Sequence, residues 1–401
     1  MRCGRCGKEN LQGAVFCARC GAPLAAAAQA VAAPAPAASP RNTRAFRATL
    51  IALAALGLLA TDLLLVGVGA GAEAFALAIA LALLPLPYYV ALGLWVDRFE
   101  PEPYRLLVAT FLWGAGVGGF LAGVLNGAGT DVVSDTLGEG EGAFYGPSVS
   151  APIVEEGLKG AVLFLLWWRT RAISGVLDGI VYALMAGLGF AFAENVSYYA
   201  MEAAEGGFPA AFTEFIGRGI LIGLLHPAMT ALTGVGIGLA VTSTRRAVKV
   251  GAPIAGLVAA MLMHSLHNSM AGGYVEFQYW LLVPLTFLTL VGVVGLSLWR
   301  ERKIVRRHVP PDVLPPDEVK ELYSIRGRLS GAIGALVRGG WRGFRARDEY
   351  IRTISELAWQ RYRASRAPEQ VEPRPSGVEA TYRSRLEDLS RRLGGEKAPA
   401  S

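Results

Sequence analysis

The sequence predicts an all-α polytopic membrane protein with about eight transmembrane helices, a small cysteine-rich N-terminal module and a helical cytoplasmic C-terminal tail. Three observations predict this class. Hydrophobic residues make up 53% of the 401 residues, whereas charged residues make up only 17%. Apolar runs of roughly 20 residues, the length that spans a bilayer as a helix, recur along the chain. The high glycine content, 49 residues, suits helices that pack closely in a membrane.

The N-terminal module, residues 1–24, contains all four cysteines of the chain as two Cys-x-x-Cys knuckles: Cys3, Cys6, Cys17 and Cys20. Four thiolates at this spacing suit a tetrahedral structural zinc site; two disulfides or free thiols are the alternatives. The pattern resembles the zinc ribbons at the ends of many bacterial membrane proteins. That resemblance implies a structural Zn²⁺ on these cysteines, a reduced cytoplasmic N-terminus and a bacterial membrane as the location. No catalytic role is expected, because a closed four-cysteine site has no open position.

The remaining chain divides by composition into three parts. Residues 25–47 are an Ala/Pro-rich linker, 48–300 an eight-helix membrane domain and 301–401 a basic tail. In the tail, helical spacing from 317 to 363 with a break at Gly339-Gly340 predicts a hairpin, followed by a short helix near 382–393. We expect this tail to be a solvated extension, with a cytoplasmic partner or anionic lipid as alternatives. The predicted spans are 49–70, 74–96, 106–126, 149–168, 175–199, 213–241, 251–271 and 279–299.

Loop charges orient these spans. Lys and Arg residues precede the first span, follow the eighth and lie in every second loop between, whereas the alternate loops carry only acidic residues. By the positive-inside rule both termini are cytoplasmic. The net charge of +6 therefore reflects topology, and no nucleic-acid partner is expected.

Ionisable residues lie inside several spans, where they are energetically costly and point to function. With the predicted orientation, Glu155 and Glu156 in the fourth span, Glu194 in the fifth and His264 in the seventh all lie in the outer half of the membrane. His226 lies near the middle of the sixth span. Four helices thus contribute polar groups at similar depth.

The spacing suggests chemistry for this cluster. Glu155 and Lys159 are four residues apart and share a helix face, as do His264 and Asn268. Imidazole and carboxylate are usual zinc ligands, and a bound metal could activate water for hydrolysis with a spare glutamate as general base. Alternatively, Glu155 or Glu156 activates water without a metal. Polar pairs that hold helices together, or an ion pathway, are the non-catalytic readings; Asp178 and Arg218 are expected to be packing or interfacial charges.

At these residues the sequence resembles the PrsW-type intramembrane proteases, relatives of the CAAX prenyl-proteases and bacteriocin-processing proteins. The resemblance covers roughly residues 80–300. The matching motifs are E-E-G-L-K at 155–159, D-G-I-V-Y-A-L-M-A-G-L-G-F-A-F-A-E-N at 178–195, His226, H-S-L-H-N at 264–268 and D-R-F-E-P-E-P at 97–103.

The resemblance implies an intramembrane endopeptidase that cleaves membrane-anchored protein substrates near the extracytoplasmic side, as in regulatory, anti-sigma-factor-like proteolysis. It implies catalytic roles for Glu155, Glu156, Glu194, His226, His264 and Asn268. A catalytic zinc on Glu156, His226 and His264 is one reading, and a metal-free glutamate mechanism is the other. The competing functions are a non-catalytic membrane sensor or scaffold and an ion-coupled transporter, although no internal repeat supports the transporter.

Overall fold

The computed structural model describes residues 41–170, 172–274, 279–314, 322–365 and 376–393, together with the single residues 2, 6, 8, 9 and 319. The chain forms two compact units, Met1–Leu50 and Ile51–Ser401. All named elements in the described part are helices, with η marking π-helical turns. They are α2 (Arg41–Ala70), α3 (Ala72–Leu83), α4 (Leu86–Val96), α5 (Tyr104–Leu112), η1 (Trp113–Gly118), α6 (Gly119–Leu137), α7 (Glu139–Tyr145), η2 (Gly146–Ser150), α8 (Ala151–Leu165), η3 (Leu166–Thr170), α9 (Val176–Glu214), η4 (Phe215–Leu221), α10 (Leu225–Thr242), α11 (Arg246–Ala271), α12 (Tyr279–His308), α14 (Ile325–Ser365) and α15 (Ser376–Arg392).

In the N-terminal unit, Arg2 and Glu9 form an antiparallel bridge on either side of the first cysteine knuckle. Cys6 is half-buried. The other three predicted zinc ligands, Cys3, Cys17 and Cys20, lie outside the described residues.

Five helical runs among the described residues are long and apolar enough to cross a membrane. They are Leu53–Ala70, Ala72–Val96, Tyr104–Leu137, Val176–Thr242 and Arg246–Ala271. The long fourth run contains the predicted spans 175–199 and 213–241. The predicted span 149–168 is helical but carries three charged side chains, and 279–299 coincides with the first part of α12. The predicted count of eight spans is therefore not confirmed.

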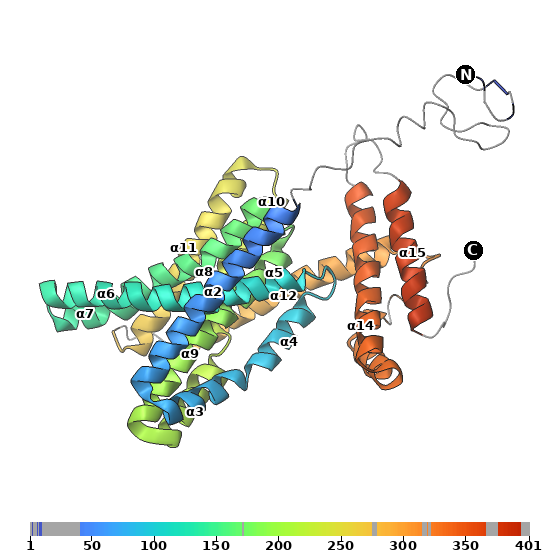
Figure 1. Ribbon diagram of the computed structural model, residues 1–401. Coiled ribbons are helices and arrows are strands. Elements are labelled where there is room, and N and C mark those ends of the chain that lie inside the picture. Colours follow the sequence, from blue (N-terminus) through green and yellow to red (C-terminus); the bar gives the residue numbers. More distant parts are fainter. Residues whose placement is uncertain are drawn as a thin grey trace. The chain divides into compact units, whose positions relative to one another are not determined.

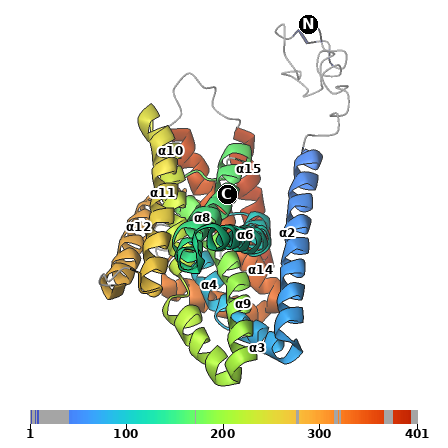
Figure 2. The same cartoon turned by 90° about the vertical axis from the view of Figure 1, so that its left-hand side faces the viewer.

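Helix α9 is the central element of the domain. Its residues from 177 to 191 are buried on every side, as expected for a helix that is apolar all round and enclosed by other helices. Helices α3, α4, α5, α8 and α10 pack against it, and α11 completes the layer beside α8 and α10 (Figures 1 and 2). The contact between α9 and α10 is close because Gly179 and Gly234 face each other: a Cβ on either one would lie 2.1 Å from the carbonyl oxygen of the other.

Two segments that the sequence suggested to be loops are helical. The acidic stretch after the third span forms the end of α6 and all of α7, which pack together and extend away from the central helices (Figure 1). Helix α9 continues beyond the fifth predicted span to Glu214. It bends at Gly207, whose φ of 67° lies in the left-handed region that glycine tolerates, two residues before Pro209.

The sixth predicted span, 213–241, is divided in the structure. Its first part is η4, and residues 222–224 interrupt the helix before α10 begins at Leu225. The interruption places His226 in the first turn of α10 rather than in the middle of a continuous span.

The C-terminal tail forms the predicted hairpin, with its break at Gly340 in α14, and a final helix α15. The hairpin is not a solvated extension, because α14 packs on the D-R-F-E-P-E-P loop between α4 and α5. The indole of Trp359 donates to the carbonyl of Phe99 at 3.1 Å, and the Phe99 ring stacks on Tyr323. Residues Ile354 and Leu357 of α14 are fully buried.

The same loop contains buried carboxyl groups. Asp97 accepts a hydrogen bond from the backbone N–H of Glu102 at 2.8 Å, and the Glu102 carboxyl accepts one from the Tyr182 hydroxyl at 2.6 Å. Burial, reinforced by the nearby charge of Asp178, raises the pKa of Glu102 to about 9, and burial raises that of Asp97 to about 8. These carboxyl groups thus favour the neutral form at the loop that supports the tail.

Candidate active site

Four helices bring the predicted site residues together. Helix α8 presents both Glu155 and Glu156 to the protein interior, and each is almost completely buried. Helix α9 supplies Glu194, α10 supplies His226 and α11 supplies His264. The two imidazole rings lie edge to face with centroids 5.0 Å apart. The residues that the sequence predicts to lie at a similar depth in the membrane therefore form one cluster.

Glu156 contacts three side chains inside the protein. Its Oε1 atom lies 2.6 Å from Nζ of Lys159 and 3.3 Å from Nδ1 of His264, and its Oε2 accepts a hydrogen bond from the Thr230 hydroxyl at 3.0 Å. Glu156 and Lys159 are both fully buried, so the ion pair compensates two charges that would be costly alone. The spacing had suggested Glu155 as the partner of Lys159, and that ion pair is also present, at the longer distance of 3.6 Å.

Glu155 has one carboxylate oxygen without a hydrogen bond. Its Oε1 accepts from the amide of Asn126 at 3.3 Å, whereas Oε2 is buried and lacks a partner at hydrogen-bond distance. The groups nearest to Oε2 are Nζ of Lys159 at 3.6 Å and Nε2 of His264 at 3.8 Å. Oε1 of Glu156 and Oε2 of Glu194 are also buried without a hydrogen bond, but each lies within 2.8 Å of a cation, so Oε2 of Glu155 is the one of the three without a close ion pair. Such an oxygen is uncommon in folded proteins and is typical of a position that binds a further group.

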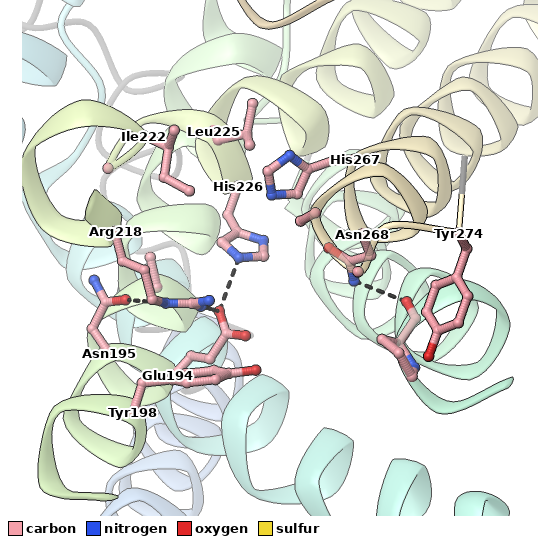
Figure 3. Close-up of a pocket in the computed structure, with 15 residues that line it drawn as sticks. Glu194, Asn195, Tyr198, Arg218, Ile222, Leu225, His226, His267, Asn268 and Tyr274 are labelled. Atoms are coloured by element: carbon pink, nitrogen blue, oxygen red, sulfur yellow. Dashed lines mark hydrogen bonds and ion pairs between the residues drawn. The ribbon is translucent and has the colours of Figure 1, made fainter. Parts of the chain in front are cut away.

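His226 is oriented by a chain of charged side chains. Its Nε2 lies 2.8 Å from Oε2 of Glu194, and the same oxygen lies 2.8 Å from the guanidinium of Arg218 (Figure 3). Arg218 also donates to the side-chain oxygen of Asn195 at 3.2 Å. With Nε2 directed at Glu194, the other ring nitrogen, Nδ1, points toward Lys159 at 3.4 Å. A carboxylate that fixes one imidazole nitrogen is the usual arrangement around metal-binding histidines, and here the second nitrogen contacts Lys159.

Glu155, His226 and His264 each place one potential ligand atom within 4.8 Å of the other two. No other such group of three occurs among the described residues. This donor set, two imidazoles and one carboxylate, is one that zinc accepts, and Oε2 of Glu155 would supply the carboxylate ligand. The residues present thus fit a metal ion. Glu155 takes the position that the sequence-based expectation gave to Glu156.

A cavity of about 270 Å³ borders the cluster. It lies between α9, the η4 segment and the end of α11, and Figure 3 shows Glu194, His226 and Asn268 among the side chains that surround it. Glu194 is the only carboxylate that lines it among the described residues. Asn268 donates to the carbonyl of Pro147 at 2.9 Å across one side of the cavity. A peptide that entered this space would reach the cluster through His226 and Glu194.

The profile of the PrsW family of intramembrane metalloproteases matches residues 102–296, and a zinc-ribbon profile matches residues 2–24. Residues 102–296, which match this family, are called the PrsW domain below. The predicted family and the predicted N-terminal zinc ribbon are thereby both confirmed. No curated protein and no solved structure is significantly similar to the chain. The PrsW match includes all four membrane motifs and begins at Glu102, inside the D-R-F-E-P-E-P motif.

Three residues of the PrsW domain contact the cluster without having been singled out as site residues. Asn126 binds Glu155, Thr230 binds Glu156 and Arg218 binds Glu194. Arg218 had been expected to be a packing charge. Asn126 and Thr230 could have been noticed in the sequence as polar residues within otherwise apolar helices. The sequence does not show which carboxylate each of them contacts.

Asp178, the other charge expected to serve packing, lies away from the cluster. Its carboxylate accepts the backbone N–H groups of Ser174 and Gly175 at 2.7 and 3.0 Å, which caps the start of α9. His267 also lines the cavity, near His226 (Figure 3), but lies outside the group of three potential metal ligands.

Proposed function

We propose that the PrsW domain is an intramembrane endopeptidase that hydrolyses peptide bonds of membrane-anchored proteins at the cavity beside His226. The observation that carries this proposal is the convergence of Glu155, His226 and His264 within 4.8 Å, next to a cavity of about 270 Å³ that His226 lines. The family match supports proteolysis as the reaction.

In this proposal Glu155, His226 and His264 hold a zinc ion. When bound, zinc lowers the pKa of a coordinated water and polarises a carbonyl group, which is the chemistry that amide hydrolysis needs. Glu194 holds His226 in the orientation that directs Nδ1 toward the zinc ligands. Glu156 is not among the proposed ligands: its Oε1 lies 2.6 Å from Lys159 and 3.3 Å from Nδ1 of His264, and its Oε2 binds Thr230.

Two cavity residues have separate proposed roles. Glu194 is the cavity-lining carboxylate, and it faces the edge of the His226 ring that is turned away from the proposed zinc, so its role is to orient His226. The amide of Asn268 has two N–H groups, of which one binds Pro147, so the second can donate to the oxygen of the scissile carbonyl. Arg218 keeps the carboxylate of Glu194 in place throughout.

The proposed side of cleavage is extracytoplasmic. His264 and Glu194 each lie 18 residues after the first residue of their helices, α11 and α9, and both of these helix starts follow arginine-containing loops. At 1.5 Å per residue this is about 27 Å along the helix, close to the full thickness of the hydrocarbon core. We propose single-span or juxtamembrane anchors as substrates, with regulatory cleavage of the anti-sigma-factor type as the role.

The test compares membrane proteomes of cells that express wild-type protein, Glu155→Gln or His264→Ala. Glu205→Gln is a matched control, because Glu205 is an exposed carboxylate on α9 far from the cluster. We expect substrate fragments with wild type and the control, and none with the two site variants at equal expression. If both site variants released every fragment that the wild type releases, the chain would be a sensor or scaffold and the protease proposal would be wrong.

Metal analysis tests the zinc separately. Purified wild-type protein should contain two zinc ions per chain, one in the ribbon and one in the membrane domain. Cys3→Ser/Cys6→Ser should lose the first ion and retain cleavage, whereas His264→Ala should lose the second ion and cleavage together. An active ribbon variant that contained no zinc would show instead that Glu155 activates water without a metal.

A further inference from the structure

The beginning of helix α14 has an unusual charge distribution. Residues 325–347, here called the arginine arm, contain six arginines and no acidic residue or lysine. The arm consists of the first limb of α14, the bend at Gly340 and the start of the second limb. Its exposed arginines are Arg326, Arg338, Arg342 and Arg345.

The apolar side chains of the arginine arm face outward. Leu329, Ile333 and Val337 follow one another at four-residue spacing and are 62%, 53% and 78% exposed, and Trp341 just after the bend is 64% exposed. This spacing places the three aliphatic side chains on one face of the first limb. A run of large apolar groups in water is unfavourable, so an exposed face of this kind indicates an interaction surface.

Small residues occupy the inner face instead. Ala335 is buried against the second limb, and a Cβ added to Gly343 would lie 2.4 Å from the Ala335 carbonyl oxygen. The two limbs therefore pack through small side chains, and the larger apolar groups are not needed to hold the hairpin together. The outward face remains available for another partner.

The arm is attached to the ends of two membrane-crossing runs. Arg328 donates to the carbonyl of Arg98 at 2.6 Å, directly after the run Ala72–Val96. Asp348, immediately after the arm, accepts from the hydroxyl of Tyr104 at 3.2 Å, and Tyr104 begins the next run. The arm thus starts and ends beside the boundary of the membrane, on the side that the loop arginines predict to be cytoplasmic.

We propose that the arginine arm lies on the cytoplasmic surface of the bilayer, with Leu329, Ile333, Val337 and Trp341 inserted at the level of the headgroups and the exposed arginines bound to anionic lipid. Amphipathic helices with a basic polar face bind membranes in this way, and the cytoplasmic leaflet supplies the negative charge. Charge complementarity selects an anionic lipid surface as the partner, and attachment to the ends of the spans keeps the arm within reach of it.

The test uses the full chain reconstituted into vesicles of brominated phosphatidylcholine, alone or mixed with phosphatidylglycerol. The fluorescence of Trp341 is obtained as the difference between wild type and Trp341→Phe. We expect Trp341 to be strongly quenched in the mixed vesicles and less quenched without phosphatidylglycerol or at high salt. Amide hydrogen exchange of residues 325–347 should slow in parallel.

The variant Arg338→Gln/Arg342→Gln/Arg345→Gln should lose most of the quenching, whereas Arg391→Gln/Arg392→Gln, a charge change at the exposed end of α15, should retain it. Unchanged exchange of the spans in both variants would exclude misfolding as the cause. An unquenched Trp341 in both vesicle types would overturn the proposal, and equal quenching in both would overturn the role of anionic lipid. Protection of the arm that required an added protein or nucleic acid would also overturn it.

Discussion

Gly187 of α9 lies against the first turn of α10, which carries His226, so adding a methyl group at Gly187 should affect both stability and cleavage. A Cβ on Gly187 would lie 2.6 Å from Cα of Pro227 and 3.1 Å from the carbonyl carbon of His226. Ordinary contact begins at 3.4 Å, so Gly187→Ala must move the first turn of α10 by about 0.8 Å. This turn carries His226, and a shift of about 1 Å in a catalytic group can lower the rate roughly 100-fold.

We therefore expect Gly187→Ala to reduce substrate cleavage by about 10- to 100-fold and to cost about 1–3 kcal/mol of stability through overpacking. The assay compares cleavage of a fragment-yielding substrate and thermal unfolding in detergent. Gly179→Ala strains the same helix pair, but eight residues earlier, or about 12 Å along α9, so it should lower stability with a smaller effect on cleavage. Gly123→Ala, with open space around it, should change neither. Wild-type cleavage by Gly187→Ala would refute the argument that this contact positions His226.

Two other predictions concern buried charges away from the catalytic step. Because the pKa of Glu102 is raised to about 9 in the folded protein, its neutral carboxyl contributes its full stability below about pH 4.5, and this contribution is lost as the pH rises toward 9. Glu102→Gln should therefore make the decline in thermal stability between pH 5 and 9 less steep. The same decline in wild type, in Glu102→Gln and in the control Glu205→Gln would contradict this. Lys159→Met leaves Glu156 buried without its cation and should cost about 3–5 kcal/mol, measured by thermal unfolding. The double variant Glu156→Gln/Lys159→Met should recover part of that loss, and no recovery would argue against the pair as the cause.

The depth of the site could be predicted from the sequence because it depends on two simple counts, the length of each span and the sign of the loop charges. Those counts placed Glu155, Glu194 and His264 at one level, and the structure brings them into one cluster. The hairpin break at Gly340 was predictable for a similar reason, since a pair of glycines permits the left-handed backbone that the bend requires.

The roles of the two adjacent glutamates could not be predicted, because they depend on how α8 is rotated against its neighbours. Helical spacing favoured the pair Glu155–Lys159, whereas packing brings Lys159 closer to Glu156, at 2.6 Å, than to Glu155, at 3.6 Å, and places both carboxylates beside His264. The interruption of the helix before α10 could not be predicted either, because hydropathy does not reveal a break of three residues. This break places His226 in the first turn of α10, where Glu194 can orient its ring.

The charges of the cluster do not cancel, and this leads to a last prediction. Three buried carboxylates, Glu155, Glu156 and Glu194, face two cations, Lys159 and Arg218, and Arg218 also pairs with Glu214 at 3.8 Å. With Glu155 ionised, negative charge is therefore in excess unless a cation binds. An uncompensated charge within the membrane costs several kcal/mol, and Glu155 is the one of the three without a close ion pair. In protein stripped of metal by a chelator, Glu155→Gln should therefore raise the thermal unfolding temperature, although the same variant is expected to be inactive. Glu194→Gln should lower that temperature, because it leaves Arg218 without its carboxylate at 2.8 Å. If Glu155→Gln unfolded at or below the temperature of the stripped wild type, the excess negative charge would already be compensated without a metal ion. The charge argument for a metal site would then be wrong.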